Sequence, residues 1–249
     1  MWHLGAPALL AVVLYPVVRV LGGSLKPGDE IVGSLEPLPT DPITGNYERL
    51  ADGIAGIGIE TFFVNSLLVA LGSVAGVLIS CSLAAYAFAR IRFAGRNVLF
   101  ALMIGTLLLP VHVLLGKFLA VDAFFVFLMV QFMRNLPREL DEAARIDGCG
   151  HWRIYWTIVL PLCRPALITS AIFSFICSWN DFPGPLIYLN EPDKYTVPLG
   201  LKMFMDQDSL ADYGGMIATS VAALLPVLLF FLAFRRHLVE GAAASGLKG

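Results

Sequence analysis

The chain has 249 residues, of which 57% are hydrophobic and only 14% are charged, whereas about a quarter of the residues in an ordinary soluble domain are charged. The formal net charge is −2 and the mean hydropathy is +0.76. These values exclude a disordered chain, a basic nucleic-acid-binding protein and a typical soluble globule. They favour a polytopic membrane protein, and because apolar stretches recur from end to end we expect one membrane domain over residues 1–249.

Six apolar stretches predict an all-α bundle of about six membrane-spanning helices. They cover residues 4–21, 61–89, 98–115, 118–133, 165–189 and 215–234. The region 98–133 is short for two crossings, because two crossings of a core about 30 Å thick need about 60 Å of helix and these residues supply about 54 Å. Either the bilayer thins there, or the fourth helix begins inside protein, or the pair is re-entrant.

Two ionisable residues, Arg19 and Asp122, lie near the ends of predicted spans. An intramembrane charge is a functional-site hypothesis by default, but these positions favour the membrane interface. The N-terminus lacks a cationic leader and a small-residue cleavage pattern, so we expect the first apolar stretch to be retained as an anchor.

Lys and Arg are unevenly distributed among the segments that join the apolar stretches. The loops 90–97 and 134–164 and the C-terminal tail together hold eleven of them, whereas the other loops hold five. The positive-inside rule therefore places these two loops and both chain termini in the cytoplasm. This topology requires an even number of crossings between Arg96 and Arg134, which two short helices satisfy.

The sequence lacks the patterns that accompany catalysis or metal binding. Its four cysteines and four histidines show no metal-ligand spacing, and it contains neither H-E-x-x-H nor a G-x-x-x-x-G-K-[ST] phosphate-binding loop. We therefore expect no catalytic residue, no metal site and no bound cofactor in this chain.

The loop 134–164 is too polar to span a membrane and predicts two short helices. Pro137 can occupy the first position of one helix, and Gly148 can end it in a left-handed conformation. Arg138/Glu142 and Asp141/Arg145 are spaced as i,i+4 ion pairs. The second helix is expected over the aromatic and apolar stretch from Trp152 to Leu160, which Pro161 ends.

The first of these helices has two interpretations on physical grounds. Its alanines permit close approach of another backbone, so it can be a docking helix held beneath the membrane. Alternatively it lies on the bilayer surface, although its polar face mixes acids with arginines whereas surface helices are usually rich in Lys and Arg alone. The residues by themselves leave both interpretations open.

The same loop resembles the EAA loop of bacterial ABC importer permeases, whose pattern is E-A-A-x3-G-x9-I-x-L-P. All fixed positions are filled, by Glu142, Ala143, Ala144, Gly148, Ile158, Leu160 and Pro161. The sequence from Leu136 to Gly148 resembles that of permeases in the carbohydrate-uptake branch, and in particular the second, smaller permease of maltose-type systems. Further similar segments are Ser24-Leu25-Lys26-Pro27, Asn65-Ser66, Ala84-Ala85-Tyr86-Ala87, Ser178-Trp179-Asn180-Asp181 and the tail from Val239 to Gly249.

One segment departs from this family pattern. Relatives of this type usually have a longer connection between the third and fourth spans, whereas here Leu115-Gly116-Lys117 leads almost directly into Phe118–Met133. The first half of the fourth span is therefore expected to be largely missing. This is the region that was already too short for two crossings, and it keeps open a transport-defective or regulatory copy of such a permease.

The resemblance implies a type I ABC importer permease fold, with the core permease region at about 61–240, in a bacterial inner membrane. The implied partners are a second permease, giving a heterodimer, an ABC ATPase dimer that binds ATP and Mg²⁺, and an extracytoplasmic solute-binding protein. The resemblance makes the EAA loop 134–164 the coupling element: Glu142 supplies a charged contact, Ala143 and Ala144 permit close approach, and Gly148 makes the turn.

The segment Trp179-Asn180-Asp181 is a candidate part of the translocation pathway for a sugar or related solute. Trp179 could stack on a sugar ring and Asn180 could bond to its hydroxyls; the alternative is a capped helix end with an interfacial tryptophan. Two other classes of membrane protein have recognisable sequence features. A secondary transporter normally shows repeats and mid-membrane charges, and a membrane enzyme shows a catalytic cluster, and neither feature is present.

Overall fold

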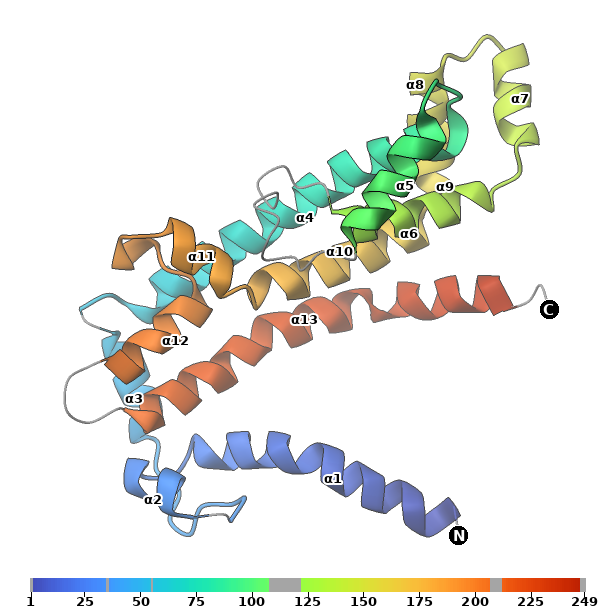
Figure 1. Cartoon of the computed structure of the whole chain (residues 1–249). Coiled ribbons are helices and arrows are strands. Elements are labelled where there is room, and N and C mark those ends of the chain that lie inside the picture. The colour runs from blue at the N-terminus through green and yellow to red at the C-terminus, as the bar shows by residue number, and fades with distance from the viewer. Residues whose placement is uncertain (1, 35, 55, 108–121, 207–211, 247–249) are drawn as a thin grey trace. The chain divides into compact units, whose positions relative to one another are not determined.

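The computed structural model describes residues 2–34, 36–54, 56–107, 122–206 and 212–246 (Figure 1). This described part is helical, without a strand longer than an isolated bridge between Ile54 and Ile57. The chain separates into two compact units. The first unit contains residues 1–68 and 179–228, and the second contains 69–178 and 229–249.

Each of the six predicted spans contains a helix, which confirms the all-α expectation. These helices are α1 (Trp2–Gly23), α4 (Ile59–Arg90), α5 (Arg96–Thr106), α6 (Ala123–Arg134), α10 (Arg164–Trp179) and α13 (Tyr213–Gly246). Among the described residues, two helices are by themselves long and apolar enough to cross a membrane, Ile59–Arg90 and Tyr213–Phe234. A third crossing is possible if His151–Leu162 and Arg164–Trp179, which are bent by 76° at their junction, form one broken span.

The helices α5 and α6 are short, as the predicted spans of this region were. They have 11 and 12 residues, so each extends roughly 16–18 Å at a rise of about 1.5 Å per residue. Asp122 caps the start of α6, because its Oδ1 accepts a hydrogen bond of 2.8 Å from the backbone N–H of Phe124. The predicted turn at 116–117 lies outside the described residues.

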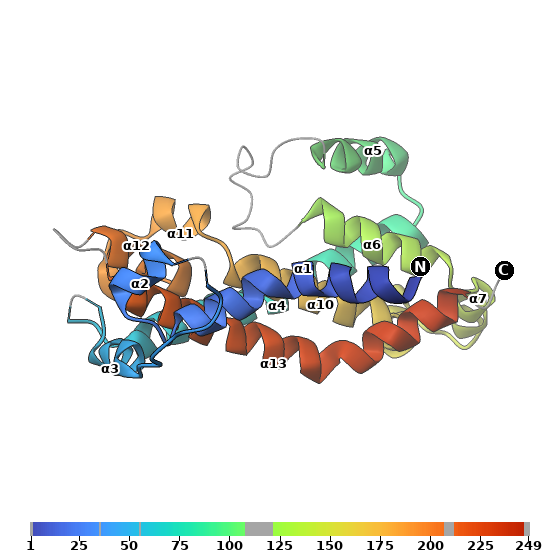
Figure 2. The ribbon, with the colours of Figure 1, turned by 90° about the horizontal axis from the view of Figure 1, so that it is seen from below.

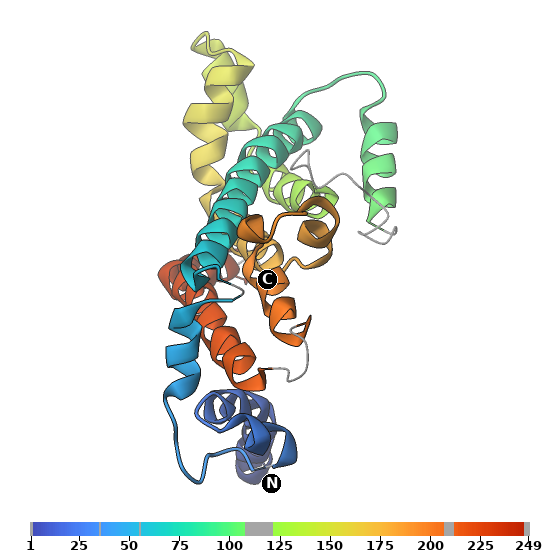
Figure 3. The same cartoon turned by 90° about the vertical axis from the view of Figure 1, so that its left-hand side faces the viewer.

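The first unit joins its helices through short elements that are held by buried polar side chains. These elements are α2 (Gly28–Gly33), α3 (Gly45–Asp52), α11 (Pro183–Tyr188), the 3₁₀ turn η4 (Pro192–Lys194) and α12 (Val197–Asp206). Figure 3 shows α3 beside the start of α13. There, Arg49 and Asp212 form an ion pair of 3.3 Å, and Asp212 also accepts a hydrogen bond from the N–H of Gly215 in the first turn of α13.

Asn46 in α3 is fully buried and joins two segments of the first unit. Its Nδ2 donates hydrogen bonds to the carbonyls of Ser24 at 2.9 Å and Lys26 at 2.8 Å, and its Oδ1 accepts one from Arg49 at 2.8 Å. These bonds fix the segment after α1, which is the Ser24-Leu25-Lys26-Pro27 sequence that the family resemblance included.

Replacing Asn46 by alanine is therefore expected to destabilise the first unit. Each of the two buried carbonyls left without its hydrogen bond costs about 1–3 kcal/mol, and at this chain length about 2–4 °C is lost per kcal/mol, so the unfolding midpoint in mild detergent should fall by at least about 4 °C. The matched control is Asn97→Ala, because Asn97 is exposed. Equal midpoints for the two variants would show that these three hydrogen bonds contribute little.

The second unit has a core formed by the C-terminal half of α4, by α6 and by the helical segment that follows residue 150. Its most buried residues include Cys81, Ala85, Met129, Met133 and Tyr155. Figure 2 shows α6 between α5 and α10. Ring contacts agree with this arrangement: the guanidinium of Arg134 lies 4.8 Å from the ring centre of Phe100 in α5, and Phe124 contacts Phe173 of α10 edge to face.

Candidate functional site

The EAA loop folds into a short helix, α7 (Glu139–Ile146), which lies with α8 (His151–Ile154) beside the C-terminal end of α4 (Figure 1). The predicted helix start at Pro137 was wrong by two residues, because Arg138 is the N-cap and Pro137 precedes it. Three acids, Glu139, Asp141 and Glu142, occupy the first turn, where the positive end of the helix dipole favours negative charge.

Gly148 ends α7 as predicted. Its φ is +80°, a left-handed conformation that costs other residues about 1–2 kcal/mol. The N–H of Gly148 bonds to the carbonyl of Arg145 at 3.0 Å, and the N–H of Cys149 bonds to that of Ala144 at 2.9 Å. These two bonds are the pair that defines a Schellman motif, so the direction of the chain after α7 is fixed by backbone geometry.

The helix α7 presents one face to its own unit and leaves the other uncovered. Asp141 and Ala144 are buried, and Ala144 belongs to the core of the second unit. Ala143 and Ile146 lie on the opposite face, where Ile146 is 87% exposed, and Leu140, four residues before Ala144 at the edge of the attached face, is 40% exposed. The two alanines of the EAA sequence therefore differ, since Ala144 attaches the helix and Ala143 faces outward, whereas Glu142 is exposed beside the end of α4.

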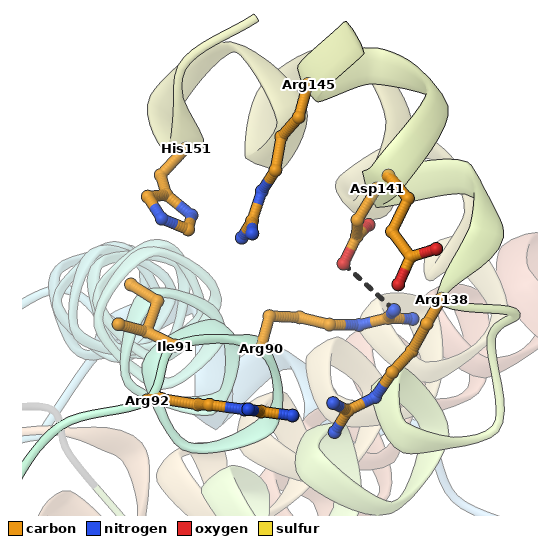
Figure 4. Close-up of a pocket in the computed structure, with 8 residues that line it drawn as sticks. Arg90, Ile91, Arg92, Arg138, Asp141, Arg145 and His151 are labelled. Atoms are coloured by element: carbon orange, nitrogen blue, oxygen red, sulfur yellow. Dashed lines mark hydrogen bonds and ion pairs between the residues drawn. The ribbon is translucent and has the colours of Figure 1, made fainter.

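Arg90, the last residue of α4, joins three segments through one guanidinium group (Figure 4). Its Nη1 pairs with Asp141 Oδ2 at 3.0 Å, and its Nη2 donates to the carbonyls of Met133 at 2.8 Å and Leu136 at 2.9 Å. The Arg90 side chain is only 3% exposed. The two carbonyls lie at and just beyond the C-terminal end of α6, where carbonyls lack partners within the helix. Arg90 thus connects α4, the end of α6 and α7.

Sequence reasoning missed this role of Arg90, which it counted only as a cytoplasmic charge. The predicted i,i+4 pair of Asp141 with Arg145 was wrong, because Asp141 pairs with Arg90 instead. Arg90 and Asp141 are 51 residues apart in the sequence, so their ion pair leaves no local residue pattern from which it could be predicted. The available signal was the arginine that ends a long apolar helix directly, where a cation must find a partner or reach water.

The second helical segment of the loop begins at His151 and continues beyond its predicted end. It comprises α8, the π-helical turn η3 (Tyr155–Val159) and α9 (Leu160–Leu162), with the break at Cys163. Pro161 therefore does not end the helix. The N–H of Leu160 bonds to the carbonyl of Tyr155, five residues back, and Pro161 then lies in the first turn of α9, where its missing N–H is tolerated.

The EAA residues of this segment attach it to the core. Ile158 and Leu160 are half-buried and pack against the core of the second unit, whereas Pro161 is exposed. Ser82 and Tyr155 share a buried hydroxyl hydrogen bond of 2.7 Å between α4 and η3. Tyr86 also donates to the carbonyl of His151 at 3.1 Å, so both ends of the EAA loop are joined to α4.

The candidate pathway residues lie at the end of α10 in the first unit. Trp179 is buried, its Nε1–H donates to the carbonyl of Ala223 at 3.1 Å, and its ring meets Phe63 edge to face. Asn180 is exposed. Asp181 accepts a hydrogen bond of 3.4 Å from the N–H of Gly184 at the start of α11. The contacts of Trp179 and Asp181 resemble those of a packed and capped helix end, and a pathway role for the three residues stays a prediction.

Two residues of the family-like sequence near the start of α4 hold the segment around η4. Asn65 Nδ2 donates to the carbonyls of Asp193 and Tyr195 at 2.8 and 3.1 Å, and Ser66 accepts a hydrogen bond of 2.8 Å from the N–H of Val197. On the same segment, the hydrogen bond and charge of Glu191 raise the pKa of Lys194. The segment around η4 is therefore attached to α4 by the hydrogen bonds of Asn65 and Ser66.

The described residues contain no group of three or more His, Cys, Asp or Glu side chains that could hold a metal ion. The geometry of the loop 134–164 is that of a mechanical connection: a short helix attached to α4 and α6 on one face and exposed on the other.

Comparison with known proteins identifies the kind of molecule that has this loop. Residues 45–241 match the family described as binding-protein-dependent transport system inner membrane component. The arabinooligosaccharides transport system permease protein AraQ of Bacillus subtilis is 33% identical over 95% of this chain and 91% of its own length. The galactooligosaccharides transport system permease protein GanQ of the same organism is 28% identical, with 97% and 92% covered.

A solved structure has the same fold. It is the crystal structure of a bacterial ABC transporter involved in the import of the acidic polysaccharide alginate, with a TM-score of 0.80, 21% identity and 94% of each chain covered. The alignment with AraQ extends over 258 positions, but only 95% of the 249 residues of this chain take part in it. Some aligned positions of AraQ therefore have no counterpart in this chain, which agrees with a shortened region without locating it.

Proposed function

The chain belongs to the family of binding-protein-dependent transport system inner membrane components, and we propose that it forms one half of the translocation pathway of a type I ABC importer. It is a permease subunit, a transport component and not an enzyme. ATP and Mg²⁺ would bind to a separate ATPase dimer, because this chain has no phosphate-binding loop. This membership excludes the secondary transporter and the membrane enzyme.

The observation that carries the proposal is the division of α7 into an attached face and an exposed face. On this short polar helix Ile146 is 87% and Leu140 is 40% exposed, and a groove of a partner subunit could cover both side chains together with Ala143. The attached face, with Arg90 and Asp141, gives the helix a firm connection to α4 and α6. If α7 lies in a groove of the ATPase, a movement of the ATPase would displace α7. Because α7 is attached to α4 and α6, these helices would be displaced with it.

The remaining partners and the orientation belong to the same proposal. The loops 90–97 and 134–164 and both termini would lie in the cytoplasm of a bacterial cell, as their charges indicate. A second, different permease would complete the pathway, and a solute-binding protein would dock on the opposite side. The names of AraQ and GanQ support an oligosaccharide or related sugar as the solute.

The docking face is tested by Ala143→Arg. Ala143 is exposed, so the larger side chain should leave folding intact and obstruct entry into a groove. Co-purification with the ATPase subunit of the importer, after mild detergent extraction, should fall at least about tenfold, which corresponds to about 1.4 kcal/mol. Ala94→Arg is the control, because Ala94 is exposed outside the EAA loop. Unchanged co-purification of the Ala143 variant would refute docking through this face.

The shortened region supports a second candidate, a copy that assembles but no longer transports. The two described helices of this region, α5 and α6, are each too short to cross a core about 30 Å thick alone. Uptake of a labelled arabino-oligosaccharide or galacto-oligosaccharide in a strain lacking the intact permease distinguishes the two. Restored uptake supports the importer, and normal ATPase assembly without uptake of any sugar offered supports the second candidate.

A further inference from the structure

The second unit contains a cavity between the end of α4 and the EAA loop, with a volume of about 420 Å³. Four arginines line it, Arg90, Arg92, Arg138 and Arg145, together with Ile91, His151 and the acids Asp141 and Glu142. Since Asp141 is paired with Arg90, three arginines face a single unpaired acid, Glu142. The cavity therefore has an excess of positive charge.

These arginines lack anionic partners within the described part of the chain. Arg92, Arg138 and Arg145 form no ion pair there. Figure 4 shows the guanidinium groups of Arg92 and Arg138 directed toward each other, and that of Arg145 directed toward the same hollow from α7. Like charges that converge repel each other unless an anion lies between them.

Buried polar atoms at the same place also lack partners. Arg90 Nε and Asp141 Oδ1 are both buried and make no hydrogen bond, although the Arg90 side chain is 97% removed from solvent and lines the cavity. A buried donor without a partner is costly. The unpaired buried donor of Arg90 and the converging arginines favour an anion in the cavity, whereas the unpaired oxygen of Asp141 needs a donor such as a hydroxyl group.

The position of the cavity suggests which anion this is. Arg90 ends the apolar helix α4, which is long enough to cross a membrane, so the cavity lies where lipid headgroups begin. Trp152 and Trp156, close to His151 along the chain, are 64% and 46% exposed, and tryptophan is enriched at that level of the membrane. Guanidinium groups bind phosphate oxygens in a bidentate manner.

A carboxylate of the ATPase is less well placed to fill the cavity. Arg138 and Arg145 are spaced three and four residues from Asp141 and so share its face of α7. This face is attached to α4, whereas the outward face with Ala143 and Ile146 is the one proposed for the ATPase. The cavity lies on the side of α7 that carries Arg138, Asp141 and Arg145.

We propose that this cavity binds the phosphate of an anionic phospholipid headgroup and thereby ties the coupling helix to the membrane surface. Basic pockets beside transmembrane helices bind such headgroups in the same manner. A bound phosphodiester would place one negative charge among Arg92, Arg138 and Arg145, reduce their mutual repulsion and hold α7 against the end of α4. The proposal depends on membrane insertion but not on docking of the ATPase, so the chain can be tested alone.

The test compares the full chain reconstituted in discs of phosphatidylcholine with discs that also contain phosphatidylglycerol. Native mass spectrometry after release from the discs should show phosphatidylglycerol retained on the wild-type chain. Retention should fall at least about tenfold in the double variant Arg92→Gln/Arg138→Gln, because each surface cation contributes about 1 kcal/mol to binding an anionic lipid. Arg153→Gln/Arg164→Gln is the control, since both residues are exposed outside the cavity, and it should retain the lipid.

A second arm distinguishes a lipid from free phosphate. Inorganic phosphate added to phosphatidylcholine discs should raise the unfolding midpoint of the wild-type chain less than phosphatidylglycerol does. Stabilisation by inorganic phosphate alone, with no retained lipid, would overturn the lipid assignment. Equal lipid retention by the cavity variant and the control variant would overturn the site itself, whatever the outcome of the ATPase experiments.

Discussion

Replacing Arg90 by methionine is expected to disconnect the coupling helix from the membrane-spanning helices. The substitution leaves Asp141 charged and buried without a partner, and it removes the donors that bond the carbonyls of Met133 and Leu136. Breaking a buried pair in this way costs about 3–5 kcal/mol. The unfolding midpoint of the purified chain should fall accordingly, and sugar uptake together with sugar-stimulated ATP hydrolysis by the assembled importer should be largely lost.

The control for this prediction is an ion pair that is exposed to solvent. Lys194 and Glu191 pair at 2.7 Å, but their side chains are 61% and 63% exposed, so Lys194→Met should have little or no effect because water screens such pairs. The double variant Arg90→Met/Asp141→Leu should recover part of the lost stability, since it leaves no unpaired charge. If Arg90→Met were as stable as Lys194→Met, the guanidinium would not be the connection that its contacts indicate.

The double variant also separates stability from coupling. If Arg90 only stabilises the structure, the double variant should regain sugar uptake in proportion to the stability that it regains. If the charged pair transmits movement between α7 and α4, stability should return while the coupling of ATP hydrolysis to uptake stays low. The ratio of sugar transported to ATP hydrolysed is the measurement that distinguishes these outcomes.

The helices of this protein could be predicted from its sequence because apolar residues dictate them locally. The six apolar stretches each contain a helix, and the spacing of Glu142, Ala143, Ala144 and Gly148 placed a turn where φ is indeed positive. Whether a position needs glycine for a positive φ depends on the backbone conformation of the few residues around it. It can therefore be read from a short segment, without knowledge of distant parts of the chain.

The connections between helices could not be predicted in the same way. Asp141 has Arg145 four residues away, yet it pairs with Arg90, which is brought close only when α4 and α6 pack together. Similarly, Pro161 was expected to end a helix, but the π-helical turn before it shifts the hydrogen-bond pattern so that the chain continues to Leu162. The first error arose because tertiary packing overrides a local rule, and the second because an irregular turn changes which N–H groups the helix needs.

Gly148→Val is expected to leave the chain inserted in the membrane but to impair its assembly with the ATPase. At φ +80° a β-branched residue is strained, and the cost of about 1–3 kcal/mol should distort the Schellman turn after α7. The direction between α7 and α8 would then change, and the exposed face of α7 with Ala143 and Ile146 would point away from the groove of the ATPase. Co-purification with the ATPase should fall by about tenfold or more.

A neighbouring glycine provides the matched control. Gly150 has φ −74° and ψ 164°, which any residue adopts, and a β-carbon has free space at both positions. Gly150→Val therefore adds the same atoms without backbone strain and should retain assembly. Gly148→Asn should be intermediate, because asparagine tolerates the left-handed region better than valine. Uptake at the normal rate by the Gly148→Val importer, at equal membrane abundance, would mean that the turn does not set the geometry through which the two subunits are coupled.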